Sequence, residues 1–224
     1  NRTCDWLIRE MQLPSGGFAS SLCADSPTVV VSATFAEGAF YTWTREEIQG
    51  VLQNDSKLIN QFLNFYQIDP ITGTFIVNKA DKKEPGAQNE VTLTNETLQR
   101  FSELQDQRIP PEKDVKVLTD WNAIAIKCLV DAGARFQRSD WLDVAIDTYQ
   151  HINFLTANNA PLLAHCSINN EPYGVAILDD YANMAQAALS LYELTGDDRF
   201  VTDVINWVNE LESGYCYSEH GGYL

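Results

Sequence analysis

Residues 118–136 read LTDWNAIAIKCLVDAGARF, and residues 178–196, which begin 60 positions later, read LDDYANMAQAALSLYELTG. Each copy starts with a leucine, then Thr or Asp, an Asp and an aromatic residue, after which the sequence is small and apolar. Self-similarity at a fixed spacing indicates a repeated supersecondary unit. The repeat therefore predicts the architecture, and it places acidic and aromatic side chains at the start of each copy.

The two copies have the polarity of buried helices. In the first copy the polar positions after the start are Lys127, Asp131 and Arg135, which form one narrow stripe. A helix that is apolar on nearly every other side is expected to be enclosed. The helices predicted over residues 141–155 and 200–211 are apolar on one face only. Enclosed and half-exposed helices therefore alternate, which predicts an inner and an outer layer.

The first half of the chain is predicted to mix short helices and strands. Thr44 followed by Glu47 is a capping box, so we expect a helix to begin near Arg45. Apolar runs on both sides of residues 36–38 predict a hairpin that turns there. Further helices are expected at 2–12, 56–66 and 94–107, a strand at 73–77, a surface loop at 79–90 and strand-like pieces within 156–177.

The charge of the chain excludes some classes of partner. The chain has 31 acidic and 15 basic residues, for a net charge of −16. It would repel nucleic acid and anionic lipid, so we expect neither as a partner. No stretch approaches the roughly 18 apolar residues of a membrane span. Five widely spaced cysteines without a CxxC pair predict reduced thiols and favour an intracellular location. Because the chain begins with Asn1, we expect it to be part of a longer protein.

Five motifs in order resemble one known family. They are GGFASSLCADS at 16–26, EGAFYTWTREEI at 37–48, RIPPEKDVKVLTDWNAIAI at 108–126, LDDYANMAQAALSLYELTGD at 178–197 and GGYL at 221–224. Together they resemble the thioredoxin-fused six-hairpin family of spermatogenesis-associated proteins. The resemblance implies a thioredoxin-type domain followed by an (α/α)6 toroid like those of six-hairpin glycosidases and sugar epimerases.

The resemblance covers the toroid part only. At about 60 residues per hairpin, 224 residues make fewer than four of six hairpins. We therefore expect an all-α fold in which residues 1–224 form one partial α/α toroid, with short β-hairpins on the loop face and no thioredoxin domain. The chain also departs from the family pattern, because Leu22 and Cys23 stand where the family has acids and Ala123 replaces a glycine. Of the first acidic group only Asp25 remains.

The acids at the starts of the inner helices are the main candidates for chemistry. Glycoside hydrolysis uses two carboxyl groups about 5–10 Å apart, and histidine is an acid and base near neutral pH. Two adjacent acids that begin one helix cannot both cap it, so one of Asp179 and Asp180 is the strongest candidate. The full set of catalytic candidates is Asp179, Asp180, Asp25 and His165. Helix capping and turn formation are the structural alternatives.

Aromatic and polar side chains beside these acids are candidates for binding a sugar. Sugar rings stack on aromatic faces, although core packing is the commoner role of buried aromatics. The substrate-binding candidates are Trp43, Trp121, Asn122, Tyr181, Glu37 and Asp120. No pair of histidines has the spacing of metal ligands, and no phosphate-binding glycine loop or serine nucleophile elbow occurs. We therefore expect no metal and no other cofactor.

Two classes of function remain open. The first is a carbohydrate-active catalytic domain, similar to a glycoside hydrolase or a sugar epimerase, that acts on a small carbohydrate. The second is a catalytically silent toroid that binds a ligand or a protein. A purely structural role for the repeats is a third possibility, which predicts that the acids do not converge. In each case an incomplete toroid would expose inner-helix surface and favour a homo-oligomer.

Overall fold

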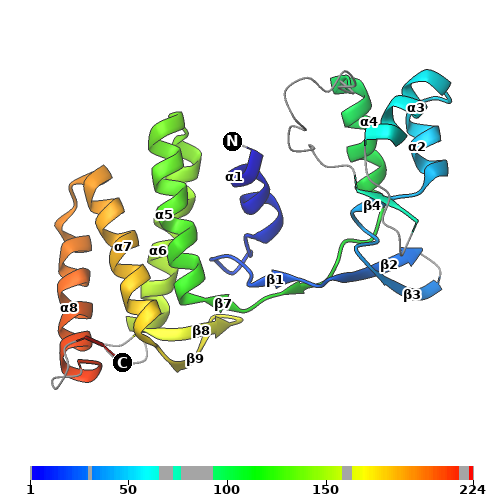
Figure 1. The fold of residues 1–224 in the computed structure, drawn as a ribbon. Helices are drawn as coiled ribbons and strands as arrows, with labels where there is room; N and C mark the ends of the chain where they lie inside the picture. Colours follow the sequence, from blue (N-terminus) through cyan, green and yellow to red (C-terminus); the bar gives the residue numbers. More distant parts are fainter. Residues whose placement is uncertain are drawn as a thin grey trace. The chain divides into compact units, whose positions relative to one another are not determined.

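The computed structural model describes residues 2–29, 32–65, 73–76, 93–157, 163–216 and 222–223. Over these residues the chain is mostly helical, with short antiparallel strand pairs (Figure 1). It divides into two compact units. We call Asn1–Leu22 with Lys113–Leu224 the helical unit, and Cys23–Glu112 the hairpin unit.

The helical unit contains both copies of the repeat. Its elements are α1 (Arg2–Trp6), the π-helix η1 (Leu7–Met11), β1 (Ser21–Leu22), β6 (Lys113–Asp114), β7 (Val117–Leu118), α5 (Thr119–Phe136), α6 (Ser139–Ala157), β8 (Ala164–Ile168), β9 (Glu171–Val175), α7 (Leu178–Thr195) and α8 (Asp198–Gly214). Strands β7, β8 and β9 form one antiparallel sheet at the foot of the helices, and β1 pairs with β6 (Figure 1). All helices predicted in this unit are present.

The four long helices form an inner and an outer pair. The repeated helices α5 and α7 pack on each other, and each also packs on the helix that follows it. The outer helices meet through Tyr149 of α6, whose ring lies edge-on to Phe200 and Trp207 of α8. The Tyr149 hydroxyl donates to a carboxylate oxygen of Asp203 at 2.8 Å. The two repeated helices therefore pack side by side, each with the following helix against it, as the repeat predicts.

The inner helices are less enclosed than their polarity predicts. On α5, Ala123, Ile126 and Leu129 are fully buried, whereas Trp121 and Ile124 are 54% and 49% exposed. One side of α5 packs on α6 and α7, and another keeps apolar side chains at the surface. Among the described residues, no helix is long and apolar enough to cross a membrane.

The position of His151 corrects a prediction from the sequence. Its place on an outer helix predicts a solvated side chain, but its Nε2 atom is buried and has no hydrogen-bond partner among the described residues. The ring packs against the turn at Gly16, where an added Cβ would come within 2.6 Å of it. Burial lowers the pKa of this histidine. The His151 ring therefore packs the turn at Gly16 against helix α6.

The hairpin unit has a smaller core of its own. It comprises β2 (Asp25–Val29), β3 (Ser32–Glu37), β4 (Thr42–Trp43), α2 (Arg45–Val51), α3 (Ser56–Phe65), β5 (Phe75–Ile76) and α4 (Asn95–Gln105). The capping box at the start of α2 is confirmed, since Thr44 and Glu47 exchange both hydrogen bonds. The predicted loop at 79–90 lies outside the described residues.

The hairpin predicted to turn at residues 36–38 is misplaced. Strand β2 pairs with β3 so that Asp25 lies opposite Glu37, and residues 36 and 37 are therefore part of a strand. The chain turns after β3, where the Tyr41 amide donates to the Gly38 carbonyl at 2.9 Å. The apolar runs marked strands correctly, but they did not specify which strands pair.

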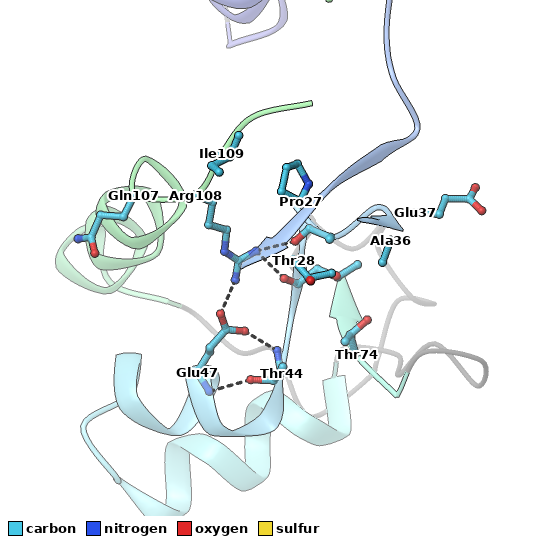
Figure 2. A pocket seen from close by; sticks show the side chains of 12 residues that line it. Pro27, Thr28, Ala36, Glu37, Thr44, Glu47, Thr74, Gln107, Arg108 and Ile109 are labelled. Atoms are coloured by element: carbon cyan, nitrogen blue, oxygen red, sulfur yellow. Dashed lines mark hydrogen bonds and ion pairs between the residues drawn. The ribbon is translucent and has the colours of Figure 1, made fainter. Parts of the chain in front are cut away.

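Arg108 joins the loop after β3 to helix α2 (Figure 2). Its Nη1 donates to the carbonyls of Ala39, Phe40 and Thr42 at 3.1, 3.0 and 2.6 Å, and its Nη2 donates to Glu47 at 2.7 Å. The guanidinium also lies 4.1 Å from the centre of the Trp43 ring. The planar fork of arginine suits such a cage, because it can donate in several directions within one plane.

We call Arg108 with its partners Ala39, Phe40, Thr42 and Glu47 the Arg108 cage. We expect it to stabilise the hairpin unit. We expect Arg108→Lys to lower its free energy of unfolding by about 2 kcal/mol, because a lysine cannot satisfy the three carbonyls and Glu47 together. Urea unfolding followed by Trp fluorescence measures this change. Arg199→Lys is the control, since Arg199 is 82% exposed and forms an ion pair with nearby Asp197, and we expect it to change stability by less than about 0.5 kcal/mol. Equal effects of the two variants would contradict the assignment.

Candidate functional site

Asp180 is a fully buried carboxylate in the first turn of α7. Its Oδ2 accepts a hydrogen bond from the Ile177 amide at 2.8 Å and lies 2.9 Å from Nδ1 of His165 on β8. Its Oδ1 accepts a hydrogen bond from the Asp120 amide in the first turn of α5, at 3.1 Å. One carboxylate therefore joins the starts of both repeated helices to the sheet beneath them.

The surroundings of Asp180 act on its charge in opposite directions. Burial raises the pKa of its carboxyl, and the nearby charge of Asp120 adds to this effect. The Ile177 amide and His165 lower the pKa, but the net result is a raised value. Burial disfavours the charged form because it removes water that would solvate the anion. The hydrogen bonds from three elements compensate part of that cost.

His165 connects this buried carboxylate to the surface. Its side chain is 36% exposed, and its Nε2 has no hydrogen bond to any residue within the described ranges. Gly174 lies beside it on the neighbouring strand β9, with a positive φ of 73° and no side chain to cover the imidazole. When Nδ1–H donates to Asp180, the lone pair of Nε2 is free to accept a proton. The pair thus has the arrangement of an oriented acid–base group.

Two further acids and an indole lie at the same helix starts. Asp179 precedes Asp180 and is exposed. Asp120 is half-buried, and its Oδ1 accepts a hydrogen bond from the Trp121 amide at 2.8 Å. The Trp121 side chain is 54% exposed. The structure therefore brings Asp120, Asp180 and His165 together. Asp179 and Trp121 are their neighbours in the sequence.

Two of the predicted binding residues, Asn122 and Tyr181, are buried in contacts with neighbouring segments of the protein. The Asn122 side chain is buried, and it accepts from the Phe18 amide at 2.7 Å while donating to the carbonyls of Phe18 and Leu118 at 3.1 and 2.9 Å. Tyr181 is buried with its ring against Tyr215, and burial raises its pKa to about 12. Both side chains hold the inner helices to their neighbours.

The remaining candidates belong to the hairpin unit. Asp25 and Glu37 are exposed and lie opposite each other on β2 and β3. Trp43 is 3% exposed, with its ring between Phe101 and the Arg108 guanidinium. The candidate residues thus fall into two groups, one in each unit.

Sequence reasoning missed two residues that shape the site, Ile177 and Gly174, and it missed the role of the Asp120 backbone amide. The roles of Ile177 and of the Asp120 amide involve backbone atoms, which carry no residue-specific signal. Gly174 matters because it lacks a side chain opposite His165. The 60-residue spacing between Asp120 and Asp180 was the one available signal, since equivalent positions on adjacent inner helices lie side by side.

Comparison with known proteins agrees with the motif-based resemblance at a distant level. No family model matches the chain. It is 26% identical to an uncharacterized protein of Caenorhabditis elegans over 229 aligned residues, which cover 88% of this chain. It is 22% identical to spermatogenesis-associated protein 20 of Homo sapiens over 255 aligned residues, which cover 98% of this chain. The chain spans about a third of the length of these relatives, 31% and 32% respectively.

The geometry of the pair predicts how Asp180 titrates. We expect its carboxyl to titrate above the ordinary pKa of 3.8, and His165→Ala to raise its pKa further, because the histidine lowers that pKa. The stability that its protonated form contributes is fully present below pH 3.8 and is lost as the pH rises through the raised value. Carboxyl carbon NMR of selectively labelled protein measures both values. Val175→Ala, on the exposed face of β9, is the control. A lower pKa in His165→Ala would refute the contact.

Proposed function

We propose that this chain carries an acid–base site for carbohydrate chemistry, of the kind found in sugar epimerases or glycoside hydrolases, with His165 as the group that transfers the proton. The supporting observation is the 2.9 Å contact between Nδ1 of His165 and the buried carboxylate of Asp180. A carboxylate on one imidazole nitrogen fixes the tautomer and the ring orientation, so that the other nitrogen can exchange a proton with a bound molecule.

In this proposal the acids have different roles. Asp180 has no exposed surface, so it acts through His165 and is a positioning residue. Asp120 and Asp179 supply the second carboxyl group that both reaction types need, as a base, an acid or a nucleophile. The half-exposed indole of Trp121 offers an apolar face on which a sugar ring can stack.

We further propose that α5–α8 are two hairpins of an (α/α)6 toroid in a thioredoxin-fused protein. This is supported by the repeat of about 60 residues, by the inner and outer helix pairs, and by distant similarity to proteins about three times as long. In a toroid the starts of the inner helices line one mouth of the ring.

A second candidate is a catalytically silent binding module. It is favoured by the structural contacts of Asn122, Tyr181 and Asp180, each of which is buried and holds neighbouring segments together. On this view His165 only fastens β8 to α7. The two candidates make different predictions about His165, because a fastening contact can be lost without loss of ligand binding.

Turnover of sugars distinguishes the two candidates. The probes are a panel of reducing monosaccharides in D2O, in which epimerisation exchanges a C–H proton for deuterium, and a panel of 4-nitrophenyl glycosides, which report hydrolysis. We expect His165→Gln to lower turnover by about 10²- to 10⁴-fold with an unchanged melting temperature. We expect His165→Ala to lose turnover to at least the same extent, because alanine can neither donate nor accept the proton.

Glu171→Gln, on the exposed turn end of the same strand pair, is the matched control and should retain full turnover. Undiminished turnover in His165→Gln would remove this residue from the mechanism. If the wild-type protein binds sugars but converts none of them, the silent module is supported instead.

We also propose that the exposed side of α5 mediates self-association. Ile124 and Cys128 are exposed and lie four residues apart, about one turn of the helix. Light scattering should detect an oligomer for the wild-type protein and a monomer for Ile124→Glu, because burial of a charge at the interface is unfavourable. Ile205→Glu, on the exposed face of α8, should leave the oligomer intact. A monodisperse wild-type monomer with a single melting transition would contradict this proposal.

A further inference from the structure

The hairpin unit contains a cavity of about 380 Å³ that neither His165 nor Asp180 lines (Figure 2). Its walls come from the strand pair β2–β3 and the loop after it, the start of α2, Thr74 just before β5, and the segment after α4. All of its lining residues belong to the hairpin unit. A volume near the lower end of the range for small-molecule sites suits a ligand the size of a monosaccharide.

The walls of this cavity are held in place by hydrogen bonds independent of any ligand. The Arg108 guanidinium is fixed by three carbonyls and by Glu47, and Glu47 is fixed in turn by the amide of Thr44 at 2.7 Å. The Arg108 guanidinium also lies over the face of the Trp43 ring, 4.1 Å from its centre. A preformed cavity binds with less loss of conformational entropy than one that must be organised by its ligand.

The charges around the cavity favour an uncharged ligand. The positive charge of Arg108 is compensated by Glu47 at 2.7 Å and by three carbonyl dipoles, so it is not available to an anion. Glu37 extends away from Arg108 at the edge of the cavity (Figure 2). The net charge of −16 adds a general repulsion of anions.

The remaining lining is a mixture of hydroxyl groups and small apolar surfaces. The Thr28 hydroxyl donates to the Thr34 carbonyl at 3.1 Å, and its oxygen can still accept a hydrogen bond from a ligand. Thr74 and Gln107 add further polar side chains to the lining. Pro27, Ala36 and Ile109 contribute aliphatic surface. Alternating C–H and O–H groups are the surface of a polyol or a sugar, whose C–H faces can lie on the aliphatic walls.

We propose that the cavity between β2–β3 and the Arg108 cage binds a small, uncharged, polyhydroxylated molecule. This site consists of residues other than the His165–Asp180 pair, and it stands whether or not that pair is catalytic. For a ligand of about twelve heavy atoms, general ligand efficiency predicts a dissociation constant in roughly the millimolar range.

Amide NMR of the ¹⁵N-labelled whole chain tests this proposal with three probes: D-glucose as the neutral polyol, ethanolamine as the cation and succinate as the anion. We expect saturable shifts with glucose at the amides of Thr28, Ala36 and Thr74. We expect no comparable saturable shifts with the two charged probes. His165→Gln should leave the glucose shifts unchanged, so failure of this site and failure of the proposed catalytic pair can be told apart.

Two variants place the binding in the cavity. Ala36→Leu fills it and should weaken glucose binding at least tenfold, whereas Ala134→Leu, at an exposed position of α5, should have no effect. Thr28→Val removes a hydroxyl at nearly constant volume and should weaken binding severalfold. If Ala36→Leu does not fold, which loss of its dispersed amide spectrum would show, Thr28→Val serves as the test variant.

Three results would overturn the proposal. They are an absence of shifts with glucose up to about 100 mM, which is far above the expected dissociation constant, shifts that survive unchanged in both cavity variants, and saturable binding of succinate or ethanolamine in preference to glucose.

Discussion

The structure of the helical unit depends on how one buried carboxylate is satisfied. An aspartate removed from water loses solvation that only several good hydrogen bonds can replace. Asp180 obtains them from three segments, namely its own helix start at Ile177, the start of α5 at Asp120, and His165 on β8. None of the three can move away without leaving a buried anion partly unpaired. The carboxylate thereby sets the relative height of the two inner helices and of the sheet below them.

The same sequence pattern makes different contacts in its two copies. In the second copy, Asp180 is fully buried and reaches back to the first copy. In the first copy, the equivalent Asp120 is half-buried and accepts only from the next amide, while Asn122 secures the N-terminal segment through Phe18. Gly17 lets the N-terminal segment lie close to the start of α5, since its φ is 74° and an added Cβ would come within 2.8 Å of the Val117 side chain. A repeat specifies the helix and its orientation, whereas the neighbour on each side decides which side chains are buried.

Periodicity and capping predicted the helices because both are local properties of the chain. The capping box at Thr44 and Glu47 and the repeated apolar pattern gave correct helix starts for α2, α5 and α7. Pairing of strands is not local, and for this reason the hairpin at residues 36–38 was misplaced. His151 illustrates another limit, because the turn that buries it lies more than 130 residues earlier in the chain. The sequence offered both His165 and Asp180 as candidates, but it predicted neither their contact nor the complete burial of Asp180.

The structural and chemical demands on Asp180 cannot be separated at that residue. Its two oxygens accept from three donors, so an amide in its place would set an NH₂ group against at least one N–H. A carboxylate is therefore required even if nothing reacts nearby. His165 is different, because the amides of Ile177 and Asp120 still connect α7 to α5 in its absence. Its ring is partly exposed beside Gly174, so packing alone does not require an imidazole at this position. The residue that separates a catalytic unit from a structural one is therefore the histidine, and the buried aspartate serves either role equally well.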